Sequence, residues 1–169
     1  MSFNLPYIAI DEDLYLNTAI LILILNNLSR NSKGNLKLDL PKIQVFMFLI
    51  KHPSHINAIL EVTGKNSPDL KQYSTYTIDS LAINVDELFN IKKTRFLLSK
   101  LASLNLLGAI DEPQNGLSFH LTDYGVKLAS EFNEAHFESV KTYIVALAPL
   151  LSITSSKLHS ALNCIFKDK

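Results

Sequence analysis

The sequence has a single cysteine among its 169 residues, and its formal net charge is zero. With only Cys164 available, an intrachain disulfide framework is impossible. We interpret Cys164 as a small apolar residue of a C-terminal helix rather than as a catalytic thiol. The 16 lysine and arginine residues balance 16 aspartate and glutamate residues, so the whole-molecule field does not attract nucleic acid. Nucleic-acid contact would need a local basic patch, and the composition favours protein partners.

Long hydrophobic runs are also missing. The longest apolar run, residues 19–25, is far shorter than the ~20 residues that a membrane-spanning helix requires. The residues before it include Asp11, Glu12 and Asp13, whereas a signal peptide would carry basic residues there. We therefore expect a cytoplasmic protein without a membrane segment.

Motifs of catalysis and cofactor binding are lacking as well. The nearest approach to a phosphate-binding loop, Gly64-Lys65, lacks the first glycine of that motif because Ile59 occupies the position. His52 and His55 have the spacing of metal ligands, but Pro53 separates them and no third ligand is evident. Carboxylates are scattered, so no general acid-base pair is suggested. We predict that the protein is not an enzyme and has no catalytic residue, cofactor or metal.

The chain has the composition of a folded globular domain, with 47% apolar and 19% charged residues. Its length fits one domain over residues 1–169. Within that domain we expect N-terminal helices at residues 1–64, a polar insertion at 65–83, a core at 84–132 and C-terminal helices at 133–169.

A first helix is predicted over residues 12–28, with Asp11 as its N-cap. Its leucine and isoleucine side chains point in nearly every direction at the helical period. Such a helix should be buried on several sides, either by this domain or by another subunit. A β-strand through residues 19–25 is the alternative.

A second helix is predicted after Asp39, which would cap it, with Pro41 in its first turn. Its apolar core face consists of Ile43, Phe46, Met47 and Ile50. Alternating leucines at residues 36–40 indicate a very short strand before this helix. A third helix would begin at Ser54 and end at Gly64.

The densest pattern lies between residues 84 and 129. A short helix at residues 86–89 and a turn at Asn90 precede a longer helix over residues 91–106. The longer helix has an apolar stripe with the spacing of a buried face, formed by Thr94, Leu97, Leu98, Leu101 and Leu104. Gly108 is suited to a left-handed cap after it.

A β-hairpin and a further helix follow. The pair Asn115-Gly116 is typical of a two-residue turn, and strands are expected on both sides, at residues 109–111 and 117–121. Thr122 or Asp123 would then cap a helix that runs as far as Phe132.

Helix, turn, helix, hairpin and helix in this order resemble the winged helix-turn-helix superfamily. The resemblance is carried by Leu-Ala-Ser-Leu-Asn-Leu-Leu-Gly-Ala-Ile at residues 101–110 and by Phe-His-Leu-Thr-Asp-Tyr-Gly at residues 119–125. It implies a mainly α fold with a winged-helix core at 84–132, a β-hairpin wing, and additional N-terminal and C-terminal helices. Winged helices bind DNA or proteins, so the resemblance alone does not decide the function.

The longer helix of this core carries the candidate contact surface, whose outward and lateral side chains are Lys92, Lys93, Arg95, Phe96, Ser99, Lys100 and Ser103. Four basic residues without an acidic one favour DNA, which the second helix of a helix-turn-helix contacts in the major groove. Against DNA, Phe96 lies near the centre of the face, and the wing carries Asp111 and Glu112, which phosphates would repel. We expect the surface to contact a protein, and DNA only weakly or within a complex.

Two short stretches of the N-terminal third give a more specific resemblance. Leu16-Asn17-Thr18-Ala19 lies near the start of the first helix, and Leu38-Asp39-Leu40-Pro41 opens the second. Together with the length and the winged-helix half, they are similar to the small middle components of bacterial ABC-three-component systems. That resemblance implies a non-catalytic adaptor in Lamassu-like defence against phage and plasmids. The adaptor would bridge an SMC/Rad50-like ATPase and an effector nuclease.

An adaptor needs apolar surface for its partners. Candidate positions lie on the first helix and on a last helix predicted at residues 155–166: Leu16, Ile20, Leu23, Leu158, Leu162 and Phe166. Packing within the chain's own core is the alternative. Two other functions also fit the sequence, a dimeric winged-helix transcription regulator similar to the MarR or PadR groups, and an antitoxin-like module that sequesters a toxic enzyme.

Overall fold

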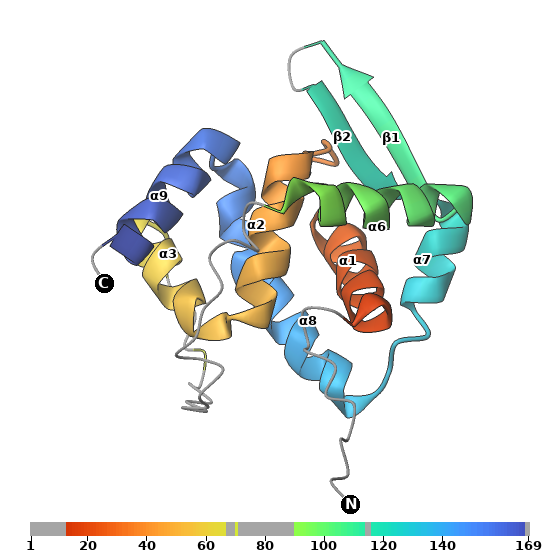
Figure 1. Cartoon of the computed structure of the whole chain (residues 1–169), viewed down its shortest axis with the longest axis horizontal. Coiled ribbons are helices and arrows are strands. Elements are labelled where there is room, and N and C mark those ends of the chain that lie inside the picture. Colours follow the sequence, from red (N-terminus) through yellow and green to blue (C-terminus); the bar gives the residue numbers. More distant parts are fainter. Residues whose placement is uncertain (1–12, 67–69, 71–89, 114–115, 168–169) are drawn as a thin grey trace, which may run out of the picture.

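The computed structural model describes residues 13–66, 70, 90–113 and 116–167 (Figure 1). This part of the chain is mainly helical, with one two-stranded antiparallel hairpin, as predicted. The short helix predicted at residues 86–89 and most of the insertion predicted at 65–83 lie outside the described residues. The α-helices are α1 (Leu14–Leu28), α2 (Leu40–Lys51), α3 (Ile56–Val62), α6 (Ile91–Ser103), α7 (Asp123–Ala129), α8 (Ala135–Leu147) and α9 (Ser155–Lys167). The 3-10 helices are η2 (Pro53–His55) and η3 (Ala148–Ser152), and the strands are β1 (Leu107–Glu112) and β2 (Gly116–Leu121).

Helix α1 is the centre of the core. Its cap is Asp13 rather than the predicted Asp11, since the Asp13 carboxylate accepts hydrogen bonds from the backbone N–H groups of Tyr15 and Leu16. Every residue from 19 to 25 is buried, and α2, α6, α7, α8 and β2 surround the helix. The alternative of a β-strand is therefore wrong, and this chain itself covers the helix.

This burial corrects the prediction that α1 faces a partner. Ile20 and Leu23 are 3% and 1% exposed, so neither side chain can reach another subunit, while Leu16 is half-buried against the same core. Burying a leucine or isoleucine side chain contributes about 1.5–3 kcal/mol, and α1 does this at consecutive positions. The apolar character of α1 on all sides stabilises the fold of the chain.

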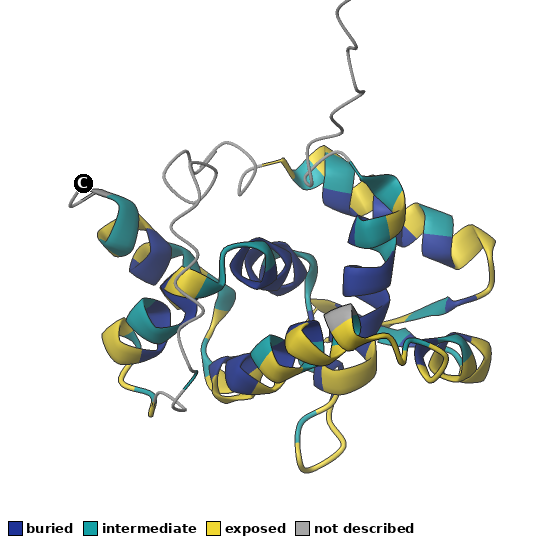
Figure 2. Ribbon diagram, turned by 90° about the horizontal axis from the view of Figure 1, so that it is seen from below, coloured by how far each residue is buried: buried dark blue, intermediate teal, exposed yellow. Residues whose placement is uncertain are grey.

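Helix α2 is buried more completely than its sequence pattern indicated. Asp39 caps it as predicted, accepting from the Lys42 N–H at 2.8 Å, and Pro41 lies in the first turn. All residues from 42 to 50 are buried, not only the predicted core face, because α2 lies between α1, α6, α8 and α9. Figure 2 shows the buried residues where the helices meet and the exposed residues on their outward sides.

The C-terminal helices close the core on the side of α2 and α3. Leu158 and Leu162 of α9 are fully buried, so these two are core residues rather than partner-facing ones. Phe166 is half-buried, and its ring lies edge-on to those of Phe48 at 5.6 Å and His55 at 5.0 Å. From the sequence, these apolar side chains could have belonged either to the core or to a partner interface. In the structure they pack within the chain.

Among the described residues, no single helix is long and apolar enough to cross a bilayer. The segments Phe137–Ser152 and Ser155–Phe166 meet the length and composition criteria only as a pair, across a bend of 118°. Both segments contribute buried side chains to the core, including Leu147 and Leu158.

Helix α6 ends three residues earlier than predicted, at Ser103. Leu104 is 53% exposed and so does not belong to the buried stripe. Asn105, with φ of 57°, adopts the left-handed conformation that was predicted for Gly108. The Leu106 N–H donates to the Leu101 carbonyl at 2.9 Å, as in a Schellman cap, and asparagine is a common substitute for glycine there.

The hairpin is longer than predicted, and its turn differs. Glu112 pairs with Gly116, so residues 113–115 connect the strands, rather than a two-residue Asn115-Gly116 turn. Gly116 has φ of 69° at the end of this connection, a backbone conformation that favours glycine. His120 is half-buried, with its ring over Gly108 of β1.

The predicted short strand at residues 36–40 is reduced to isolated contacts. Leu36 forms a bridge with Arg30, and the Leu38 carbonyl accepts a hydrogen bond of 2.9 Å from the Phe119 N–H of β2. This bond attaches the base of the hairpin to the segment between α1 and α2. Strands β1 and β2 extend away from the helices in Figure 1.

Thr122 joins α7 to the end of α6. Its hydroxyl accepts from the Gly125 N–H at 3.2 Å and donates to the Asn105 carbonyl at 2.7 Å. Its own N–H donates to the Leu106 carbonyl at 3.1 Å. Thr122, rather than Asp123, is therefore the cap of α7, and the helix ends at Ala129, before the predicted Phe132.

Candidate interaction surface

The two faces of α6 differ sharply in burial. Thr94, Leu97, Leu98 and Leu101 are buried against the rest of the core, as predicted. At 3.6 residues per turn, Phe96 lies on the opposite side of the helix. The Asn90 side chain caps α6 by accepting from the Lys93 N–H at 3.2 Å, so both ends of the helix are fixed.

The structure brings the predicted contact residues together on one continuous helix surface. We call the exposed members the basic face: Lys92, Arg95, Phe96, Ser99 and Ser103. Phe96 is 57% exposed in the middle of this face. Lys93 and Lys100 are half-buried at its edge, and the Lys100 ammonium lies 5.4 Å from the ring centre of Tyr15 on α1. The predicted exposure of the basic face is therefore seen in the structure.

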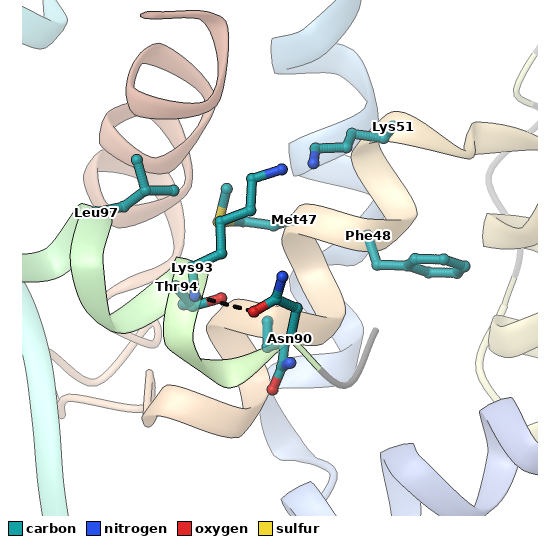
Figure 3. Close-up of a pocket in the computed structure, with 8 residues that line it drawn as sticks. Met47, Phe48, Lys51, Asn90, Lys93, Thr94 and Leu97 are labelled. Atoms are coloured by element: carbon teal, nitrogen blue, oxygen red, sulfur yellow. Dashed lines mark hydrogen bonds between the residues drawn. The ribbon is translucent and has the colours of Figure 1, made fainter. Parts of the chain in front are cut away.

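A shallow groove between α2 and α6 borders the basic face (Figure 3). Met47, Phe48 and Leu97 supply apolar lining, while Lys51 and Lys93 supply ammonium groups whose side chains extend toward the same region in Figure 3. Lys51 could not be predicted as part of this surface, because only tertiary packing places the last turn of α2 beside α6. The sequence feature that could have pointed to Lys51 is its place as a basic residue at the end of an apolar helix.

The hairpin has a different surface character. Asp111 is exposed near the tip, and Ile110 and Leu117 are 43% and 50% exposed. By register, Ile110 pairs with Ser118 and Asp111 pairs with Leu117, so the two apolar side chains lie on opposite faces of the hairpin. The hairpin therefore offers scattered apolar groups and acid rather than a basic surface.

His52, His55 and Cys164 do not belong to the basic face. His52 and His55 contact the rings of Phe48 and Phe166 respectively at the junction of α2 and α3. Cys164 is exposed on α9. In the residues that the structure describes, no group of three or more His, Cys, Asp and Glu side chains could hold a metal ion.

Lys42 is a buried lysine at the start of α2. Its ammonium donates to the carbonyls of Leu151 and Lys37, at 3.2 and 3.3 Å. Burial lowers the pKa of Lys42 from its ordinary value of 10.5, against the attraction of Asp39 and together with repulsion by Lys37. The side chain joins α2 to η3. Burial removes water from its ammonium group, which makes the charged form less favourable.

The lowered pKa predicts a specific dependence of stability on pH. Between the folded pKa of Lys42 and 10.5, the unfolded chain binds more protons than the folded chain, so the free energy of unfolding should rise with pH. In Lys42→Met this contribution disappears. Urea denaturation at several alkaline pH values measures it as a shallower rise in the variant. Lys33→Met, at an exposed lysine, is the control and should keep the wild-type rise. Equal slopes in Lys42→Met and wild type would contradict the prediction.

Comparison with known proteins identifies one family. The model of ABC-three component (ABC-3C) system Middle Component 4 matches residues 28–160. That range contains the predicted signature at residues 38–41 but not the one at 16–19, and it covers α2, α6 and the hairpin. No curated protein and no solved structure matches the chain.

Proposed function

The chain belongs to the ABC-three component (ABC-3C) system Middle Component 4 family, and on that premise we propose that it is a non-catalytic adaptor subunit. The observation that carries the proposal is the match over residues 28–160, since a middle component implies association with the other components of its system. The basic face supplies a surface for such an association. ATP hydrolysis and nucleic-acid cleavage would then belong to the partners.

We further propose that the core is a winged helix. Helices α1, α2 and α6 pack against one another, the hairpin follows α6 directly, and the Leu38–Phe119 hydrogen bond attaches the hairpin to the segment before α2. In a winged helix a β-hairpin follows the second helix of a helix-turn-helix, and the predicted first helix of that motif, residues 86–89, lies outside the described residues. In this proposal α6 is the second helix of the helix-turn-helix, and the hairpin is the wing.

The partners that we propose are an SMC/Rad50-like ATPase and an effector nuclease of a Lamassu-like defence system in the bacterial cytoplasm. The resemblance in the N-terminal third supports this choice. An adaptor between two such proteins needs exposed surface for its partners, and Phe96 together with the exposed Lys92 and Arg95 supplies such a surface.

Expression of the complete native locus with a tag on this chain tests the adaptor function. The other components should co-purify with the wild-type chain, whereas Phe96→Glu should weaken their retention by roughly 30-fold, as expected for the loss of a hot-spot residue worth about 2 kcal/mol. Val145→Glu, at a 64% exposed position on α8, is the matched control and should retain them. Purification of the wild-type chain alone, while the other components assemble without it, would refute the adaptor function.

A second candidate, a DNA-binding regulator, is favoured by one observation, the four basic residues of α6 beside a hairpin. It requires a homodimer that binds a palindromic operator, with an affinity that falls steeply as salt rises. Lys92→Ala together with Arg95→Ala should then abolish operator binding. Lack of sequence-specific binding by the wild-type chain at low salt would eliminate this candidate.

A further inference from the structure

We infer that the basic face of α6 binds an acidic protein segment that places a large apolar side chain on Phe96. The inference rests on the proposed adaptor function and names the chemistry of one partner. It combines the burial of α6, the charges around Phe96 and the acid of the wing.

Phe96 indicates an apolar contact at the centre of the surface. Its ring is 57% exposed, and it lies on a helix that is capped at both ends and packed on the core by four buried residues. A fixed helix cannot turn this ring inward, and the described part of the chain leaves it exposed, so we assign its cover to a partner molecule. Aromatic side chains in that situation are enriched at the centres of protein interfaces, where they pack in desolvated pockets.

The charges around Phe96 indicate the sign of the charge that the partner carries. Lys92, one turn before Phe96, and Arg95, the residue before it, are both exposed, and no acidic residue occurs between residues 91 and 110. Lys93 and Lys100 add positive charge at the edge, as does the amino-terminal end of α6. Carboxylates of an incoming segment would therefore be attracted, whereas a basic segment would be repelled.

Protein rather than nucleic acid is the occupant that the surface favours. A base-reading helix presents polar side chains to base edges, and Phe96 occupies the central position here. Asp111 is exposed on the wing, where DNA-binding winged proteins gain from phosphate contacts. An extended or helical segment with one apolar anchor can contact α6 without approaching the wing tip.

Site-specific photo-crosslinking tests the inference directly. Phe96 is replaced by p-benzoyl-phenylalanine, the tagged chain is expressed with the other components from the native locus, and crosslinked peptides are identified by mass spectrometry. The expected product is a peptide of another component of the system, with more acidic than basic residues and a large apolar residue at the crosslink. The same amino acid at Val145 is the control and should give at least tenfold less of this product.

Two further measurements separate the charge from the apolar contact. Lys92→Glu combined with Arg95→Glu, two exposed positions where folding should be preserved, should reduce the Phe96 crosslink by at least tenfold. Lys157→Glu, at an exposed position on α9, should leave it unchanged. Raising the salt concentration from about 0.1 to 0.5 M should weaken the crosslink several-fold, since it shortens the range of the attraction.

The outcomes distinguish the inference from the proposed function. An intact complex in which Phe96 crosslinks to DNA, to a basic peptide, to a second copy of this chain or to nothing would overturn the inference alone. Insensitivity of the crosslink to the double charge reversal would also overturn it. A native locus that yields no complex at all would overturn the adaptor function, and with it the inference.

Discussion

Replacing Leu23 by aspartate is expected to unfold the chain rather than to disrupt a partner contact. Leu23 is 1% exposed in the middle of α1, surrounded by the other helices and by the base of the hairpin. Truncation of a buried leucine costs about 2–5 kcal/mol, and a buried carboxylate adds a solvation penalty. The sum is comparable with the roughly 5–15 kcal/mol that stabilises a domain of this kind. Circular dichroism and urea denaturation would show the loss of cooperative unfolding.

Asn26→Asp is the matched control for this substitution. Asn26 is exposed on the same helix, three residues further along, so the carboxylate stays in water. Its cost should be below about 1 kcal/mol, which is the size of an unfavourable charge near a helix carboxyl end. A Leu23→Asp chain that folds normally and loses only its partners would show that α1 contacts another subunit.

The sequence predicts the elements of this fold well, because the elements depend on local patterns. Asp39 and Thr122 are caps recognisable from the residue type, and the stripe from Thr94 to Leu101 has the spacing of a buried helix face. Each signal lies within one or two helical turns of the structure that it specifies. The exposure of Phe96 follows from the same periodicity, which is why the basic face was predictable.

The covering of α1 was not predictable, because it depends on contacts between distant parts of the chain. A helix that is apolar on every side can lie in the core of its own chain or at an interface with another subunit. Only the positions of α7, α8 and β2 decide between the two. The same reason applies to Leu158 and Leu162. The contribution of Lys51 to the groove also required the packing of α2 on α6.

Two local predictions were wrong for reasons that lie in the backbone. Asn105 tolerates a positive φ well enough to end α6 three residues before Gly108, which leaves Gly108 inside β1. In the hairpin, the pairing of Glu112 with Gly116 requires a three-residue connection instead of a two-residue turn. At the end of α6 either Asn105 or Gly108 could supply the left-handed conformation, and Asn105 supplies it.

Because α1 is buried, the predicted contact residues that could still bind a partner are those on α6. Since the α1 positions at Ile20 and Leu23 and the α9 positions at Leu158 and Leu162 belong to the core, they are not free to form an interface in the folded chain. The predicted contact residues that stay in water lie on the basic face. Because the basic face is exposed while these other positions are buried, substitutions in the two sets separate loss of partner binding from loss of folding.

Gly125→Ala is expected to destabilise the chain by roughly 3 kcal/mol, although alanine is the better helix former by about 1 kcal/mol. An alanine Cβ in the first turn of α7 would overlap the carbonyl oxygen of Leu106 and would lie 3.1 Å from a methyl group of Leu121. The Leu106 backbone cannot retreat, because it donates to Leu101 and accepts from Thr122. Thermal unfolding should show a Tm roughly 10 °C lower than that of the wild type.

Gly108→Ala provides the contrasting case. A Cβ at Gly108 would meet the His120 ring at 2.6 Å, and a ring at the end of a rotatable side chain can move or be removed. Its cost should be about 1 kcal/mol and should disappear in a His120→Ala background, as a double-mutant cycle would measure. Leu121→Ala should not rescue Gly125→Ala in the same way, because the principal overlap is with the backbone. If Gly125→Ala unfolds at or above the wild-type temperature, α7 is not held against the end of α6, and the Thr122 junction does not fix the hairpin to the helices.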